Sequence, residues 1–240
     1  MILDCSSYES TKKSLLDIFC TTEEKLASVL QSINPLESSY KPAEQVLYDE
    51  ACYILGHPKG NISVVWFHGT RTEDSSLFYK LGILTKSKAR KFIEPRLKEL
   101  SEGMESFGSN PFSMSLSGKQ EAHDEGPFAF LIRDIAIHAP SPNHNYLDAP
   151  EMIEDIAGTL LGENYSQLVS RFKETSAPCL VSFISNSKGY ELPQALLYLK
   201  LVEDGESHFE AASSANTFFD SENVVVSPNR IKSVELIEIV

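Results

Sequence analysis

The sequence predicts an α+β fold, because helical and strand-like patterns fall in separate blocks and do not alternate strictly. Apolar residues recur at helical spacing through residues 1–56, and a short β-branched and aromatic run follows at Ser63–Phe67. Residues 125–175 return to helical spacing, and strand-like runs dominate the remainder. We therefore expect a single domain over residues 1–240, with an N-terminal helical lobe at 1–56 and a helical insert at 125–175.

Turn and capping residues set the expected helix limits. Thr21-Thr22-Glu23-Glu24 has the sequence of a capping box, and the helix after it should end at Asn34-Pro35. A second helix should begin after Pro42 and end at Gly56. Further helices are expected at Ser75–Lys80, from Pro95, from Pro150 to Gly162, and from Tyr165. Four later runs have the composition of strands: Cys179–Ile184, Ala195–Val202, Asn223–Val226 and Val234–Val240.

Composition limits the classes of partner. The chain has 240 residues, of which 42% are apolar, enough for a proper core. Its net charge of −13 argues against non-specific binding to nucleic acid or to an anionic membrane. One local exception is a group of cations that suits either a pyrophosphate or a solvated helix face: Lys80, Lys86, Lys88, Arg90 and Lys91.

The sequence gives little support for metal, disulfide or membrane chemistry. Its four cysteines are scattered, and His123, His138 and His144 lack the spacing of metal ligands, so no metal is expected. No basic and apolar leader is present, and no apolar run approaches the ~18 residues of a spanning helix. We expect a soluble protein that is cytoplasmic, or secreted without a cleaved signal peptide. The common phosphate-binding, nucleophile-elbow and zinc-protease motifs are also absent from the sequence.

The most informative stretch is Val65–Arg71, in which an apolar run changes abruptly to His68-Gly69-Thr70-Arg71. Polar residues that follow a buried strand are well placed to meet a ligand. Gly69 allows close backbone approach, while Thr70 and Arg71 add a hydroxyl and a cation. A capped turn without a ligand is the alternative interpretation.

Two separated motifs resemble the ADP-ribosyltransferase superfamily, in the branch that has a His-Tyr-Glu triad. The first comprises Trp66–Thr72 with Leu77 and Leu81-Gly82-Ile83, and the second comprises Ser221–Ile231 with Val234–Ile237. Together they cover only about 40 residues of the chain. The resemblance implies a split β-sheet core and NAD as the substrate. It also implies transfer of ADP-ribose to a protein, nucleic-acid or small acceptor.

The resemblance also implies roles for individual residues. His68 would bind the adenosine ribose of NAD, and Gly69 would offer backbone groups to the nicotinamide amide. Glu222 would open a strand and stabilise the positive charge that develops on the ribose as nicotinamide leaves. Asp220 resembles, weakly, a position that orients the acceptor. Thr70 and Arg71 would brace the loop or touch the phosphates, unless Arg71 pairs with Glu73 or Asp74.

The middle element departs from the family pattern. Pro111–Ser117 alternates apolar and serine side chains as a half-buried strand does, but Ser113 stands where a stacking Tyr is expected. Phe112 or Phe107 would then supply the aromatic face, and a strand whose serine face meets solvent is an equal alternative. The missing Tyr keeps two other functions open: a non-catalytic module that binds NAD or a partner, and an NAD hydrolase.

Overall fold

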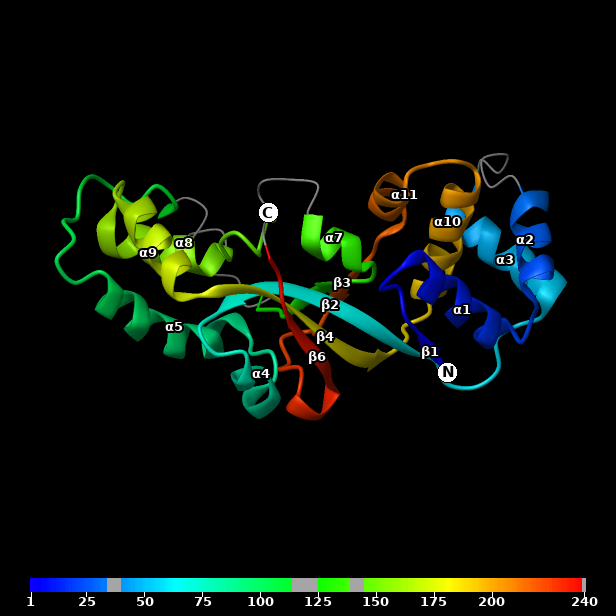
Figure 1. Cartoon of the computed structure of the whole chain (residues 1–240), viewed down its shortest axis with the longest axis horizontal. Coiled ribbons are helices and arrows are strands. Elements are labelled where there is room, and N and C mark those ends of the chain that lie inside the picture. Colours follow the sequence, from blue (N-terminus) through cyan, green and yellow to red (C-terminus); the bar gives the residue numbers. More distant parts are fainter. Residues whose placement is uncertain (34–39, 114–124, 139–144, 239–240) are drawn as a thin grey trace. The chain divides into compact units, whose positions relative to one another are not determined.

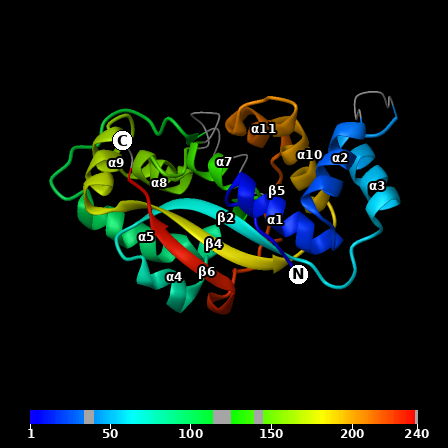
Figure 2. The same cartoon turned by 45° about the vertical axis from the view of Figure 1, so that its right-hand side comes forward.

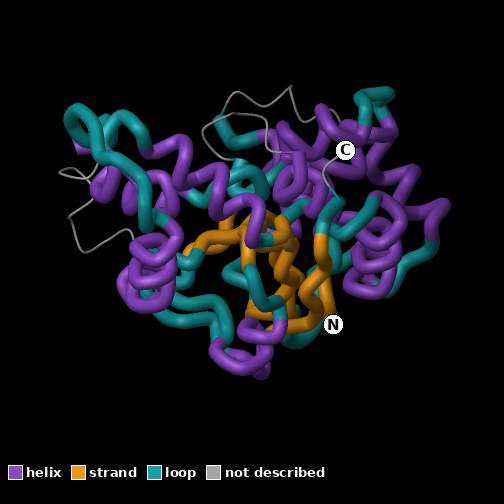
Figure 3. The backbone as a smooth tube through the Cα atoms, turned by 60° about the vertical axis from the view of Figure 1, so that its left-hand side comes forward, coloured by secondary structure: helices purple, strands orange, loops and turns teal. Residues whose placement is uncertain are grey.

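The computed structural model describes residues 1–33, 40–113, 125–138 and 145–238. Its helices are α1 Tyr8–Phe19, α2 Glu23–Ser32, α3 Ala43–Leu55, α4 Ser76–Leu81, α5 Lys86–Leu100, α7 Arg133–His138, α8 Glu151–Leu161, α9 Tyr165–Thr175, α10 Glu191–Glu203, α11 His208–Ala215 and the 3-10 helix η3 Pro228–Arg230 (Figure 1). Its strands are β1 Ile2–Leu3, β2 Ser63–Thr72, β3 Phe128–Phe130, β4 Ala177–Asn186, β5 Phe218–Asp220 and β6 Ile231–Leu236. The fold is therefore α+β, as predicted (Figure 3).

The strands form one six-stranded sheet in the order β5-β3-β2-β4-β6, with β1 paired to β2 outside this path. The pair β1 and β2 is parallel, with Leu3 opposite Val64, whereas β2 and β3 are antiparallel, with Phe67 opposite Phe130. Figure 2 shows β6 beside β4. The apolar run of β2 is fully buried from Val64 to Phe67, which explains its nearly continuous hydrophobic sequence.

Contacts within the chain define two compact units. The first comprises residues 1–67, 130–140 and 183–219, and the second comprises 68–129, 141–182 and 220–240. The boundary falls inside several strands, so that Phe67 belongs to the first unit and His68 to the second. All the predicted site residues therefore lie in the second unit.

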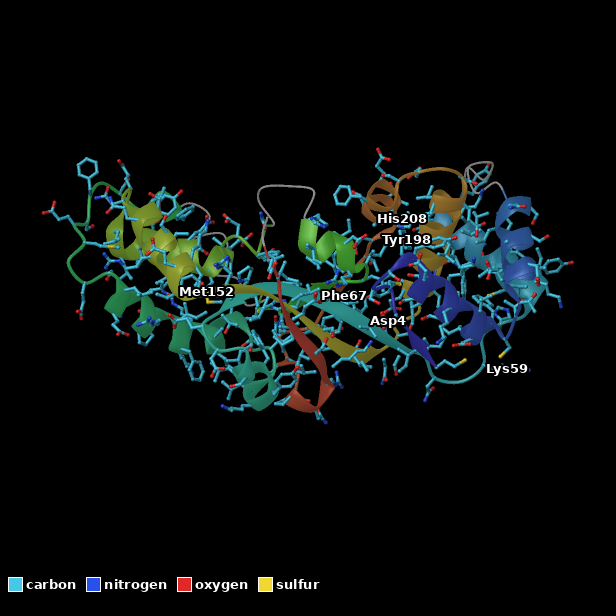
Figure 4. The ribbon with its side chains drawn as sticks, viewed as in Figure 1. Asp4, Lys59, Phe67, Met152, Tyr198 and His208 are labelled. Carbon is cyan, nitrogen blue, oxygen red and sulfur yellow. The ribbon has the colours of Figure 1, made fainter. Side chains whose placement is uncertain are left out.

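The first unit is built around aromatic side chains and the buried helix α10. Trp66 packs against Phe219 with 5.5 Å between ring centroids, and its Nε1–H donates to Ser185 Oγ at 3.0 Å. Tyr8 of α1 contacts Tyr198 of α10 and His208 of α11, which are labelled in Figure 4. These contacts explain why the N-terminal helices are amphipathic: each buries one face against the unit.

The second unit has an apolar core of its own between α5, α8 and α9. Its buried members include Leu97 of α5, Ile156 of α8 and Leu168 of α9. Met152 of α8, labelled in Figure 4, packs against this cluster. The helical spacing of α8 and α9 thus reports their packing against each other and against α5.

Several helix limits agree with the predictions. α3 begins after Pro42 and ends at Gly56, and α8 begins after Pro150 and ends at Gly162. α4 is shifted by one residue from its predicted limits. The capping prediction for α2 was wrong by one residue: Thr22 is the N-cap and accepts from Lys25 N–H, so no glutamate completes a capping box.

Other predictions were wrong for identifiable reasons. Ala195–Val202 lies in helix α10, which is buried on almost all sides and so reads as a continuous apolar run. Pro95 lies inside α5 and faces solvent, where the helix loses only one backbone hydrogen bond. The 125–175 segment is mostly helical where the structure describes it, as predicted, with α7, α8 and α9, but it also contains the short strand β3. The final strand is β6, which begins earlier than predicted, and residues 239–240 lie outside the described residues.

Candidate functional site

Strand β2 carries the His68-Gly69-Thr70-Arg71 sequence within it and not after it. The strand was expected to end at Phe67, but it continues to Thr72. His68 and Thr70 are half-buried, and Gly69 is buried. The change from apolar to polar residues therefore marks a change in the surroundings of one continuous strand.

The hydrogen bond of His68 fixes its tautomer. Nδ1 lies 2.7 Å from the backbone oxygen of Phe128, and because a carbonyl can only accept, Nδ1 carries the proton and donates. Burial lowers the pKa of the imidazole below its ordinary value, while the hydrogen bond to Phe128 acts in the opposite direction. A neutral ring with Nδ1–H leaves Nε2 as a hydrogen-bond acceptor at neutral pH.

The segment from Glu125 to Phe128 joins His68 to the second sequence motif. Phe128 accepts from His68, and the preceding Pro127 accepts from Ser221 N–H at 3.2 Å. Glu125 N–H donates to Asn223 Oδ1 at 3.1 Å. Ser221 and Asn223 are the sequence neighbours of Glu222. Both are therefore hydrogen-bonded to the same segment that accepts the hydrogen bond of His68.

A backbone bridge joins the two motifs directly. Ile83 and Val226 exchange two hydrogen bonds of 3.0 Å each. The preceding Gly82 has φ +75°, and a Cβ there would stand 1.9 Å from Val226 O. The bridge therefore needs glycine at this position, both for its conformation and for the close approach of the two backbones.

Glu222 lies in a turn that follows strand β5. It is exposed, has φ +57°, and its N–H donates to Asp220 Oδ1 at 2.8 Å. The prediction that Asn223–Val226 forms a strand opened by Glu222 was wrong: Asn223 also has positive φ, and only Val226 pairs, with Ile83. Two successive residues with positive φ bend the chain out of extended geometry.

Arg71 braces the second unit. Four of its N–H groups are used: Nε donates to Ser176 Oγ, and the terminal nitrogens donate to the backbone oxygens of Leu147, Lys173 and Ser176 at 2.7–3.1 Å. Burial lowers the pKa of its guanidinium, which nonetheless remains a cation in proteins. With so few donors left, Arg71 is better suited to holding the C-terminal end of α9 than to binding phosphates.

The suggested pairing of Arg71 with Glu73 or Asp74 was wrong. Glu73 instead binds Arg96 through two N–H groups at 2.9–3.0 Å. Asp74 Oδ1 accepts from the N–H of Ser76, the first residue of helix α4, at 2.9 Å. Each carboxylate thus has a structural partner of its own.

The predicted strand at Pro111–Ser117 was wrong where the structure describes it. Residues 111–112 form a turn, Ser113 is helical, and residues 114–117 lie outside the described residues. Phe112 packs edge-on against Tyr165 of α9, with 4.8 Å between ring centroids, and Ser113 is exposed. Phe107 pairs with Gly162 at the end of α8. Phe107 is thus joined through its backbone to the end of α8, and the Phe112 ring is already engaged in packing against α9.

Phe128 is an aromatic residue that the sequence interpretation missed, and its backbone oxygen contacts His68. It is half-buried on β3, and the ammonium of Lys86 lies 5.8 Å from its ring centroid. A cation over an aromatic face marks a ring that accepts positive charge. The alternation Phe128-Ala129-Phe130 was a strand signal, but it is too short to stand out within a helical stretch.

Comparison of the chain with family models, with curated proteins and with solved structures found no match. Within the described residues, no helix combines the length and apolar composition needed to cross a membrane. The same part of the chain holds no group of three or more His, Cys, Asp and Glu residues arranged to bind a metal ion. The function is therefore inferred from the site residues themselves.

Proposed function

We propose that the chain is an ADP-ribosyltransferase that uses NAD. The observation that carries the proposal is the linkage of the two resembling motifs: Ile83 is bridged to Val226, and Phe128 and Pro127 accept hydrogen bonds from His68 and Ser221. Residues more than 150 positions apart in the sequence are thereby tied to one short segment of the second unit. A shared site for one substrate requires this kind of linkage.

The proposed chemistry assigns each side chain a role. His68 Nε2 accepts a hydrogen bond from a ribose hydroxyl of NAD, because Nδ1–H is already bound to Phe128. Gly69 and Thr70 offer backbone and hydroxyl groups near the nicotinamide amide. The Phe128 ring takes the stacking role for which Phe112 and Ser113 were considered.

Glu222 acts on the bond that breaks. As the bond between ribose carbon and nicotinamide nitrogen breaks, nicotinamide leaves with the electron pair and the ribose becomes an oxocarbenium-like cation. The carboxylate of Glu222 stabilises that charge. A nucleophile of the acceptor then bonds to the ribose carbon and loses a proton.

The test compares two carboxylate variants with wild-type protein. NAD labelled on its adenylate half is supplied, and free nicotinamide and macromolecule-bound label are measured. Glu222→Gln should lower nicotinamide release by roughly 100-fold or more while NAD affinity stays within about twofold. Glu174→Gln, an exposed carboxylate of α9, is the matched control and should behave as wild type.

Two results would overturn the proposal. Nicotinamide release without any labelled acceptor identifies an NAD hydrolase. Binding of NAD without release, in wild type and Glu222→Gln alike, identifies a non-catalytic binding module.

A further inference from the structure

The first half of α5 is a cationic surface in an otherwise acidic chain. Residues 75–93 contain five cations and no Asp or Glu, whereas the whole chain has a net charge of −13. Lys80 lies on α4, and the other four lie on α5: Lys86, Lys88, Arg90 and Lys91. A local excess of this kind in an acidic protein concentrates positive potential on one surface.

The outward face of α5 combines these cations with an aromatic ring. Lys88, Lys91 and Phe92 are spaced i, i+3 and i+4, so they share one helical face, opposite the buried Leu97 and Leu100. Lys88 and Lys91 are exposed, and Phe92 retains 60% of its accessible surface. Among the described residues, no carboxylate forms an ion pair with either lysine, whereas Arg90 pairs with Glu94 at 2.9 Å. We define Lys88, Lys91 and Phe92 as the α5 face.

The α5 face adjoins the candidate site through the first turn of the helix. Lys86 N–H donates to Glu125 O and Ser87 N–H donates to Glu125 Oε2, each at 2.9 Å. Glu125 N–H in turn donates to Asn223, the neighbour of Glu222. The helix that carries the α5 face is therefore anchored to the residue beside the proposed catalytic carboxylate.

We infer that the α5 face binds a single-stranded nucleic acid, and that this strand is the acceptor of ADP-ribose. The two lysines bind successive backbone phosphates, and a base stacks on the Phe92 ring. An acidic protein surface would satisfy the lysines but would leave the exposed ring unused. The binding part of the inference is independent of NAD, whereas the acceptor part rests on the proposed function.

The net negative charge of the chain limits but does not prevent this binding. At physiological ionic strength the screening length is about 8 Å, so distant carboxylates act weakly on a strand held at the α5 face. Binding should therefore be modest and depend on few phosphate contacts. In the acceptor reaction, a base nitrogen or sugar hydroxyl of the strand bonds to the ribose carbon of NAD and releases a proton, while nicotinamide leaves with the electron pair of its broken bond.

The binding test uses a fluorescently labelled thymidine oligonucleotide of about 20 residues in the absence of NAD. Its binding is measured by fluorescence anisotropy at roughly 50 and 200 mM salt. The double variant Lys88→Glu with Lys91→Glu should bind at least about tenfold more weakly and lose roughly one to two units of salt slope. Phe92→Ala should weaken binding about fivefold. The matched control is Lys13→Glu with Lys59→Glu, two exposed lysines of the first unit that give the same charge change (Lys59 is labelled in Figure 4). Equal binding by the two double variants, or tighter binding of a glutamate-rich peptide, would overturn the inference.

The acceptor test adds labelled NAD to the same proteins. Wild type should label the oligonucleotide, and the Lys88 and Lys91 double variant should lose this labelling while it still releases nicotinamide. If wild-type protein releases no nicotinamide, this result counts against the proposed function and not against strand binding. Strand binding without strand labelling by an active wild type would overturn the acceptor assignment.

Discussion

Ile83 and Val226 exchange two backbone hydrogen bonds of 3.0 Å, although 143 positions separate them in the sequence. Each belongs to one of the two motifs on which the resemblance to ADP-ribosyltransferases rests. The bridge fixes the backbone at Val226, which lies four residues after Glu222. Its integrity should therefore matter both for stability and for any activity of Glu222.

Gly82→Ala tests this bridge. The new Cβ would stand 1.9 Å from Val226 O, so one of the two backbones must move. Gly103→Ala is the control, because Gly103 has a similar φ of +80° and open space around it. Gly103→Ala should cost about 1–2 kcal/mol of backbone strain, and Gly82→Ala at least about 2 kcal/mol more. Urea unfolding measures both. Equal costs would show that the close approach of the backbones contributes nothing.

The sequence predicted elements whose limits depend on local chemistry. Pro42 with Gly56 and Pro150 with Gly162 set helix ends because proline fixes φ at a helix start, whereas glycine can adopt the positive φ at which these two helices end. The apolar run before His68 likewise predicted a buried strand. In each case the local sequence is sufficient to predict the element.

Elements decided by tertiary surroundings were missed. Helix α10 is buried on most sides, so its sequence lacks the polar face that distinguishes a helix from a buried strand. Strands β3 and β5 are only three residues long, so they are defined mainly by their pairing with neighbouring strands and not by a sequence pattern. The candidate site shows the same division: His68 and Glu222 were found from motifs, whereas Phe128 depends on a strand that only the fold defines.

The pH dependence of stability should report the titration of His68. Burial lowers the pKa of the His68 imidazole in the folded state below 6.5. Below about pH 6.5, His68 is therefore protonated in the unfolded chain while it is still neutral in the folded chain. Stability is thus unaffected above that pH and falls as the pH drops toward the folded pKa, by at most about 1.4 kcal/mol per pH unit. His68→Asn keeps a donor for Phe128 but cannot titrate, so it should lose less stability between pH 6.5 and 5.5. Parallel declines in urea unfolding experiments would contradict this prediction.

Arg71 should be needed for folding and not for NAD. Arg71→Lys removes the fork that reaches Leu147, Lys173 and Ser176, and leaves carbonyl groups without donors. We expect a loss of about 2–4 kcal/mol in the free energy of unfolding. Arg96→Lys, at a more exposed ion pair with Glu73, should cost much less. Isothermal titration with NAD at a temperature where both variants are folded should give the wild-type affinity. A selective loss of affinity in Arg71→Lys would instead indicate that Arg71 touches the phosphates.

The aromatic partner of nicotinamide can be assigned by comparing Phe128 with Phe112. The backbone oxygen of Phe128 accepts from His68 and its ring lies beneath the Lys86 ammonium, whereas Phe112 is engaged with Tyr165. A lost aromatic stack is worth about 0.5–1.5 kcal/mol, so Phe128→Leu should raise KM for NAD roughly threefold to tenfold, and Phe128→Tyr should restore it. Phe112→Leu should lower thermal stability without changing KM. If Phe112→Leu raises KM and Phe128→Leu does not, the stacking ring comes from the turn at residues 111–112, and the site extends toward α8 and α9 instead of β3.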